Sequence, residues 1–228
     1  MGEPQYELLY KDKDLLIVDK PGGLLSVPLP EGDSVNLLEM MYERYGQQSP
    51  PIQAIHRIDR FTSGIMIFSR HGKAHTRMVD QLKSGKIVRR YLAVVKNQME
   101  QWSGTLEHHL KLIKDGFQNI VVSPGVSGAT PARLHYKVLE PLQNAALVQI
   151  ELETGLKNQI RVQFAAVGHP LIGDRQYGEG ETNHLLDRQA LHAEYVEFLH
   201  PIRGTQIKRK APLPEDMGNL IKKLRLNG

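Results

Sequence analysis

The sequence predicts an α+β fold, in which one mostly antiparallel sheet carries a few helices. Short runs rich in β-branched and aromatic residues recur along the 228-residue chain, and they alternate with a smaller number of segments that have helical spacing. No internal repeat, low-complexity block or clear linker interrupts this pattern. We therefore expect residues 1–228 to form a single domain with a sizeable core.

The first half of the chain is predicted to begin with a strand and a helix. Residues 15–23 (LLIVDKPGG) form an apolar run that ends in a Lys-Pro-Gly turn signal, which is typical of a strand followed by a turn. Residues 34–46 have Ser34 as a candidate N-cap, spaced apolar residues and a terminal glycine, so they predict a helix. The next elements are expected in this order: a short strand in 54–60 that leads into a turn, a buried strand at 64–70, a helix at 71–85 and an alternating strand at 87–95.

The second half is predicted to be richer in strands. Short runs of β-forming residues lie at 104–113, 117–123, 133–140 and 145–153. Residues 158–168 end in a glycine and predict a short helix. A further strand is expected at 189–201, and a basic tail ends in a helix at 217–226.

Composition excludes several classes of protein. The absence of cysteine excludes disulfides, thiolate metal sites and a cysteine nucleophile. No apolar run approaches the length of a membrane span, and the N-terminus lacks the apolar stretch of a signal peptide. Tyr6 stands where N-myristoylation requires serine or threonine. We therefore expect a cytoplasmic protein that does not bind a membrane.

The charge distribution favours a polyanionic partner, although weakly. The net charge is +4 and the sequence pI is near 9.2. Basic residues gather in short clusters at 86–90, 208–210 and 222–225. Such clusters suit contacts to phosphates, and they are equally typical of an ordinary solvated surface.

Cofactor and metal motifs are missing from the sequence. It contains no GxGxxG, no GxxxxGK[ST] and no HExxH. His71 and His75 have metal-ligand spacing on a predicted helix, but no third ligand stands nearby in the sequence. The adjacent pair at 108–109 lies on a predicted strand and faces opposite ways. We therefore expect neither a nucleotide cofactor nor a bound metal.

Asp59 is the outstanding carboxylate of the chain. It lies between Arg57 and Arg60 in the stretch HRIDRFTSG, residues 56–64. Two guanidinium neighbours would hold the carboxylate ionised even where it is partly desolvated. The Thr62-Ser63-Gly64 turn beside it permits a close approach of another group to its backbone. The residues alone leave two interpretations open, a reactive carboxylate and an ordinary turn residue paired with a neighbouring arginine.

The stretch HRIDRFTSG resembles the HRLDxxTSG signature of the RluA family of RNA pseudouridine synthases. Further segments resemble that family in the same order: YKDKDLLIVDKPGGLLSVP, VRRYLAVV, LETGLKNQIRVQFAAVGHPLIGD and LHAEYVEFLHPIRG with the following APLP. The resemblance covers about residues 8–214. It is closest to the short subgroup with a single catalytic domain and without an N-terminal S4-type RNA-binding module.

The resemblance implies a fold and a reaction. The family fold is a mixed, mostly antiparallel sheet with flanking helices and a central RNA-binding cleft. The reaction breaks the N1–C1′ bond of a uridine, turns the uracil over and joins C5 to C1′, without a cofactor. The partner implied is a stem-loop of ribosomal or transfer RNA, and the family tends toward monomers.

The resemblance also assigns roles to residues at matching positions. Asp59 is the expected nucleophile, attacking the base or the sugar, and Tyr91 and Arg161 are expected to converge on it. Arg57 would reach into the RNA and help to fill the space that a flipped uridine leaves. The remaining contacts to the RNA are expected from His56, Arg60, Arg90, Lys157, Asn158 and Ile160, of which Ile160 fits the core equally well.

The chain departs from the family pattern at several positions. Leu156 and Asn158 replace an arginine and a histidine of the usual TGRxHQIR, and Gln163 stands where a histidine is frequent. Arg90 replaces the usual lysine before the tyrosine, and the usual threonine of a KxAxT stretch is displaced around Leu134. These departures leave open a catalytically impaired RNA-binding or chaperone protein of the same fold. A hydrolase based on Asp59 is disfavoured, because no second carboxylate accompanies it in the local motifs.

Overall fold

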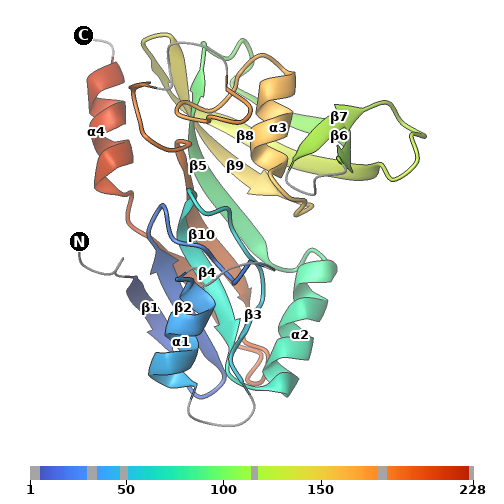
Figure 1. Cartoon of the computed structure of the whole chain (residues 1–228), viewed down its shortest axis with the longest axis vertical. Helices are drawn as coiled ribbons and strands as arrows, with labels where there is room; N and C mark the ends of the chain where they lie inside the picture. The colour runs from blue at the N-terminus through green and yellow to red at the C-terminus, as the bar shows by residue number, and fades with distance from the viewer. Residues whose placement is uncertain (1–5, 30–34, 47–50, 114–117, 179–183, 226–228) are drawn as a thin grey trace. The chain divides into compact units, whose positions relative to one another are not determined.

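The computed structural model describes residues 6–29, 35–46, 51–113, 118–178 and 184–225. Over this part of the chain the fold is α+β, as predicted, with strands β1 to β11 and helices α1 to α4 (Figure 1). The chain divides into two compact units. The first unit is residues 1–89 with 193–212, and the second is residues 90–192 with 213–228. That the two units fold as one domain stays a prediction.

The first unit is built on a sheet with the strand order β1-β2-β4-β10, and β3 and β11 are added at β4 and β10. The pairs β1–β2, β2–β4, β3–β4 and β10–β11 are antiparallel. Two helices, α1 and α2, belong to this unit. The bounds are β1 Glu7–Lys11, β2 Leu15–Lys20, α1 Leu37–Tyr45, β3 Gln53–Ala54, β4 Ser63–Ser69, α2 Gly72–Lys83, β10 Leu191–Leu199 and β11 Gln206–Lys210.

Every residue of β4, and all of β2 except Asp19, is buried. A strand that is apolar on both faces must be covered on both faces, so these two strands lie at the centre of the unit. Their side chains join the core cluster with residues of α2, β10 and β11: Leu15, Ile17, Ile55, Ile65, Ile67, Met78, Ile87, Val196, Phe198, Ile207 and Ala211. This core supports the turns at the ends of β2 and β4, which carry the candidate site.

The second unit is built on a sheet with the strand order β5-β9-β8-β6-β7, and its described pairs are antiparallel. Asn144, with φ +50°, makes the tight turn between β8 and β9, a conformation that asparagine tolerates well. The C-terminal helix packs its apolar face into a core with Val94, Leu142 and Ile172. The bounds are β5 Val88–Lys96, β6 Ser103–Leu112, β7 Asn119–Val122, β8 Thr130–Leu142, β9 Ala145–Leu152, α3 Gln159–Ala166 and α4 Glu215–Leu224.

Most predicted elements are present, with two local corrections. The strand expected in 54–60 is wrong beyond its first residue, because β3 ends at Ala54. The N–H of Ile55 still donates to the carbonyl of Ile67 in β4, but Ile58 then bonds to the side chain of Ser26. The first helix is capped by Asn36, whose Oδ1 accepts the backbone N–H of Glu39 at 3.1 Å. Ser34, the expected cap, lies outside the described residues. None of the described helices is long and apolar enough to cross a membrane.

Candidate active site

The turn that carries Asp59 is held by a buried lysine. Lys20, at the end of β2, is fully buried, and its ammonium donates to three main-chain carbonyl groups. The acceptors are the oxygens of Pro21 at 2.8 Å, Leu24 at 2.7 Å and Arg60 at 3.0 Å. Hydrogen bonds from a charged donor are the stronger kind, so this ammonium ties the turn after β2 to the turn before β4.

Further hydrogen bonds fix the backbone on both sides of Asp59. On one side, Ser26 Oγ donates to the carbonyl of Ile58 at 2.6 Å and accepts its N–H at 3.2 Å. On the other side, the N–H of Gly23 donates to the carbonyl of Arg60 at 2.9 Å, and Arg60 Nε returns a bond to the carbonyl of Gly23 at 2.9 Å. The main chain around Asp59 is therefore fixed by partners from residues 20–26.

Asp59 itself is half-buried and begins a tight turn, in which the N–H of Thr62 donates to its carbonyl at 3.0 Å. Arg57 and Arg60 are exposed on either side of it. The guanidinium of Arg60 contacts the Gly23 carbonyl and lies 5.5 Å from the ring of Phe61. That the two arginines keep the Asp59 carboxylate ionised stays a prediction.

Gly64 shows what the predicted close approach is. Its φ is +111°, and a Cβ at this position would lie 2.3 Å from the carbonyl oxygen of Ala193. The backbone that approaches is therefore that of β10, which neighbours β4 in the sheet. Only glycine fits here, because both the dihedral angle and the contact exclude a side chain.

His56 is neutral at physiological pH. Burial, together with the charge of Arg89, lowers the pKa of the His56 imidazole to about 3. Its Nε2 is buried without a hydrogen-bond partner. Any contact of His56 with RNA would therefore be made by an uncharged ring, not by a cation.

Arg90 and Tyr91 lie on β5, where neighbouring side chains point to opposite faces of the sheet. Tyr91 is 6% exposed and stands opposite Ile150 of β9. Arg90 Nε donates to Glu151 Oε2 at 2.8 Å, and both side chains are about 40% exposed. The ion pair leaves Arg90 accessible to solvent, so a contact of Arg90 with RNA stays a prediction.

The guanidinium of Arg161, in the second unit, is fixed by several hydrogen bonds. Arg161 projects from α3, is 8% exposed, and pairs bidentately with Asp174 through Nε at 2.7 Å and Nη2 at 2.8 Å. Asp174 is fully buried, and its Oδ1 also accepts the N–H groups of Gln176 and Tyr177 at 3.0 and 3.1 Å. The guanidinium lies 5.1 Å from the ring of Tyr177. Such a fork-to-fork pair fixes the plane of the guanidinium.

Asn158 joins this network from the residue before α3. Its backbone has φ +56°, and its amide donates to Gln176 Oε1 at 3.2 Å and to the Tyr177 hydroxyl at 3.3 Å. Gln176 Oε1 also accepts from Arg161 Nη2 at 3.1 Å. Asn158 is only 8% exposed, so in this structure it supports its neighbours more than it offers a surface to a ligand.

The other departures from the family pattern also have a structural reason. Leu156 is partly buried and packs against the apolar cluster of Leu110, Ala132 and Val162. Gln163 is fully buried and donates to the carbonyls of residues 106 and 132 and to a histidine ring at position 108. These substitutions keep the packing of α3 and do not alter Asp59, Tyr91 or Arg161.

Lys157 and Ile160 have different surroundings. The carbonyl of Lys157 accepts from the amide of Asn119 at 2.6 Å, and its side chain is half-buried. Ile160 is 4% exposed, in agreement with a core position. Their roles toward RNA stay predictions.

Three residues of the network were not assigned a role from the sequence. Asp174 ends the segment HPLIGD, which carries part of the resemblance, and Gln176 and Tyr177 follow it. An aspartate that directly follows an apolar run and a glycine is a signal for a buried carboxylate, but the sequence does not show its partner. The structure shows that this partner is Arg161, 13 residues earlier in the chain.

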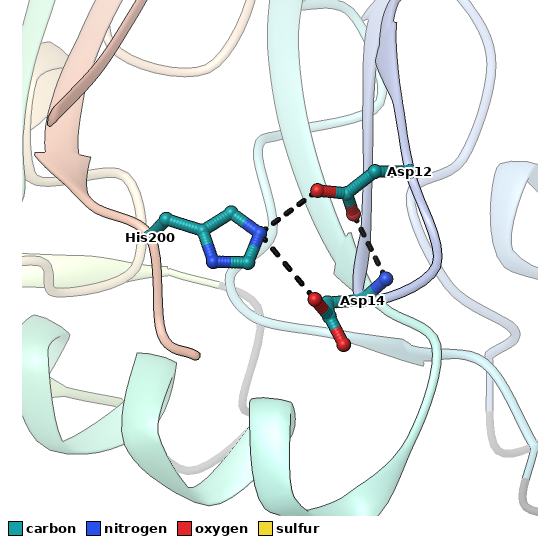
Figure 2. Close-up of side chains that lie close together, drawn as sticks. All are labelled: Asp12, Asp14 and His200. Atoms are coloured by element: carbon teal, nitrogen blue, oxygen red, sulfur yellow. Dashed lines mark hydrogen bonds and ion pairs between the residues drawn. The ribbon is translucent and has the colours of Figure 1, made fainter. Parts of the chain in front are cut away.

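A second polar cluster lies in the first unit and consists of Asp12, Asp14 and His200 (Figure 2). Their ligand atoms lie within 4.8 Å of one another, a spacing that would suit a metal ion. However, His200 Nδ1 accepts the backbone N–H groups of Ile202 and Arg203 at 3.2 and 3.0 Å. The proton is therefore on Nε2, which donates to Asp12 Oδ2 at 2.8 Å and has no lone pair for a metal.

Both carboxylates of this cluster are already bonded by protein groups. The guanidinium of Arg203 contacts Asp12 Oδ2, and Asp14 Oδ1 accepts from His71 Nε2 at 2.8 Å. His71 Nδ1 accepts the N–H of Ala74 at 3.3 Å, so its proton is also on Nε2. The cluster joins the β1–β2 turn to α2 and to the end of β10, and we interpret it as structural.

The described residues form an α+β architecture with an arginine-flanked carboxylate at a fixed turn. Comparison with solved structures supports the fold. Human RNA pseudouridylate synthase domain containing 4 aligns with a TM-score of 0.78 at 21% identity, over 97% of this chain and 94% of that chain. The corresponding human domain containing 1 gives 0.76 at 22% identity, over 93% and 85%.

Sequence comparison identifies the family. The model of the RNA pseudouridylate synthase family matches residues 14–166. The RNA pseudouridine synthase YhcT of Bacillus subtilis is 37% identical over 227 residues, which are 96% of this chain and 73% of that protein. Ribosomal large subunit pseudouridine synthase D of Escherichia coli is 33% identical over 241 residues, 98% of this chain and 72% of that protein. The chain belongs to the RNA pseudouridylate synthase family.

The resemblance stated from the motifs is thus confirmed, and with it the α+β fold and the enzyme class, an isomerase that forms pseudouridine in RNA. The comparisons give no support to the catalytically impaired alternative, whose basis was the altered TGLKNQIR segment. Asp59 lies in the first unit and Tyr91 and Arg161 lie in the second. Their convergence on one site stays a prediction.

Proposed function

We propose that this enzyme isomerises uridine in large-subunit ribosomal RNA, with the Asp59 carboxylate as nucleophile. The observation that carries the proposal is the fixed turn of Asp59, whose neighbouring carbonyl groups are bonded by the buried ammonium of Lys20 and by Gly23. A pre-positioned nucleophile needs such a rigid support, because even a small displacement reduces the rate strongly. The choice of RNA follows relatives named ribosomal large subunit pseudouridine synthase D.

The reaction conserves all atoms. The Asp59 carboxylate forms a bond to C6 of the base or to C1′ of the sugar, and the N1–C1′ bond breaks. C5 of the turned uracil then joins C1′, and the bond to Asp59 breaks, which restores the carboxylate. The proton on C5 is then lost to solvent, and a proton is taken up at N1. The balance needs no oxidant, reductant or co-reactant, and the uracil must stay captive between the two steps.

Arg161 and Tyr91 complete the proposed site. Arg161, with its guanidinium plane fixed by Asp174, would pair with the Asp59 carboxylate and keep it ionised. Tyr91 would stack against the uracil and assist the removal of the C5 proton. Ile160 would supply an apolar surface below the base, which favours the ring over water.

The RNA contacts follow from the exposed cations. Arg57 would enter the space left by the flipped uridine, since a planar cation that stacks suits this place better than lysine. Arg60, Arg90 and Lys157 would contact the RNA, while half-buried His56 and buried Asn158 would support the site. We propose that the enzyme acts in the cytoplasm, where it would meet ribosomal RNA, and that it acts as a monomer.

The experiment measures tritium release from RNA labelled at uracil C5. Purified protein is incubated with a transcript of large-subunit ribosomal RNA or with a transfer RNA transcript, without additives. We expect tritium release from the ribosomal transcript and none from Asp59→Asn, which should bind the RNA with nearly unchanged affinity. Release by Asp59→Asn at the wild-type rate would refute the assignment of the nucleophile, and release from the transfer RNA alone would refute the choice of substrate.

A further inference from the structure

The turn that begins at Asp59 presents two side chains that the reaction itself does not require. The bond from Thr62 N–H to the Asp59 carbonyl closes a four-residue turn, with Arg60 and Phe61 at its two central positions. Phe61 is 46% exposed, and the guanidinium of Arg60 lies 5.5 Å from its ring centroid. Thr62 and Ser63, which follow, are 1% and 2% exposed. The side chains of Arg60 and Phe61 at the centre of the turn are thus exposed, and those of Thr62 and Ser63 are buried.

Phenylalanine is an unusual choice at such a position. Central turn residues are commonly glycine, asparagine, aspartate, serine or proline, each for a conformational reason that does not apply to phenylalanine. Nearly half of Phe61 faces water, so part of its side chain is accessible to a ligand.

Hydrogen bonds to the turn after β2 fix the position of Arg60. Lys20 Nζ and Gly23 N–H both donate to the carbonyl of Arg60, and Arg60 Nε donates to the carbonyl of Gly23. The backbone and the side chain of Arg60 are therefore bonded to the same fixed turn. A surface held this way loses little conformational entropy when it receives a ligand.

We propose that Arg60 and Phe61 form a stacking platform for the nucleotide next to the target uridine. Guanidinium planes and aromatic rings are the two kinds of group on which unpaired bases stack in RNA recognition. The platform is two residues from Asp59 along the chain, so a base stacked on it would neighbour the base that reacts. The proposal rests on the proposed function, because it needs an RNA substrate at Asp59.

The platform would increase the affinity for RNA and would not take part in the isomerisation. Stacking on an aromatic side chain is tolerant of sequence but favours purines, which have the larger π-face, and it adds no charge contact. Loss of the ring should therefore raise the dissociation constant without changing the dependence of binding on salt. Loss of a phosphate contact would instead reduce the salt dependence.

The test uses an 11-nucleotide single-stranded RNA with one central uridine, flanked by adenosines and carrying 2-aminopurine on one side of the uridine. Binding is followed by fluorescence anisotropy and by the 2-aminopurine emission, for wild type, Phe61→Leu and Phe61→Trp. Tyr42→Leu is the matched control, because Tyr42 is 51% exposed on α1 of the same unit. Thermal unfolding of each variant confirms that the fold is intact.

We expect Phe61→Leu to weaken binding about 5- to 150-fold and to abolish the change in 2-aminopurine emission. Phe61→Trp should retain both, and Tyr42→Leu should behave as wild type. The slope of the dissociation constant against salt should be the same for wild type and Phe61→Leu. The platform would be overturned if wild type and Phe61→Leu had equal affinity and equal 2-aminopurine emission. It would also be overturned if binding to the wild-type protein left the 2-aminopurine emission unchanged.

Tritium release from the ribosomal transcript, measured on the same preparations, separates the two proposals. Release by the wild type together with unaltered binding by Phe61→Leu would overturn the platform alone. No release by the wild type, together with the expected loss of stacking in Phe61→Leu, would overturn the proposed reaction and support the platform as an RNA contact.

Discussion

Replacement of Lys20 by methionine tests whether the buried ammonium holds the Asp59 turn. Methionine has nearly the same length and fills the same space, but it cannot donate to the carbonyls of Pro21, Leu24 and Arg60. Three bonds from a charged donor at about 1.5 kcal/mol each give about 4.5 kcal/mol. The variant regains part of this because it no longer buries a charge, so we expect a net loss of about 2–4 kcal/mol in the free energy of unfolding.

Urea titration followed by circular dichroism measures this loss directly. In a chain of this size each kcal/mol lowers the melting temperature by about 2–4 °C, so Lys20→Met should melt about 4–16 °C below wild type. Tritium release should fall more than the folded fraction does, because the nucleophile loses its fixed position. The matched control is Lys13→Met, an exposed lysine near the start of β2, which should change stability by less than about 0.5 kcal/mol. Equal stability of the two variants would refute the reasoning.

Three further predictions concern the support of the two units. Burial alone would raise the pKa of Asp12, but hydrogen bonds from the Tyr10 hydroxyl and from two backbone N–H groups outweigh it and hold the pKa at about 2, below the ordinary 3.8. The Asp12 contribution is therefore present above about pH 4, and about 2 kcal/mol of it is lost as the pH falls from 4 to 2. In urea titrations, the decline over this range should be about 2 kcal/mol smaller for Asp12→Asn than for wild type. Gly64→Ala should cost about 3 kcal/mol or more, since the added Cβ meets the β10 backbone at a positive φ, and a soluble variant of wild-type stability would contradict the close approach. Asp174→Asn should cost about 3 kcal/mol and abolish tritium release, because Arg161 loses its bidentate partner, whereas the exposed Asp187→Asn should leave both unchanged.

The sequence predicted the elements that carry a strong local signal. The apolar runs of β2 and β4 and the glycine-ended helix α2 are present where the spacing placed them. β1 and β11 were missed, because their short, charged segments resemble loops and become strands only by pairing with β2 and β10. The loop around Asp59 was predicted in part as a strand, because it contains the β-forming residues Ile55 and Ile58. Both are buried, but they lie after the end of β3 at Ala54.

The candidate site could be predicted only as far as its motifs reach. Asp59 and Arg161 stand in recognisable stretches, and so both were named. The bond from Lys20 to Arg60 joins residues 40 positions apart, and no local pattern reveals such a contact. The same holds for the Arg161–Asp174 pair, which depends on how the loop after α3 returns to that helix. Long-range hydrogen bonds of this kind follow from the fold and not from the spacing of residues.

The most direct measurement of the central claim is a map of pseudouridine in ribosomal RNA from cells that lack this protein, complemented with wild type or with Asp59→Asn. The account predicts that at least one pseudouridine of the large-subunit RNA disappears in the cells without the protein. It returns with the wild-type chain and stays absent with Asp59→Asn at equal protein abundance. Restoration of that pseudouridine by Asp59→Asn would contradict the account.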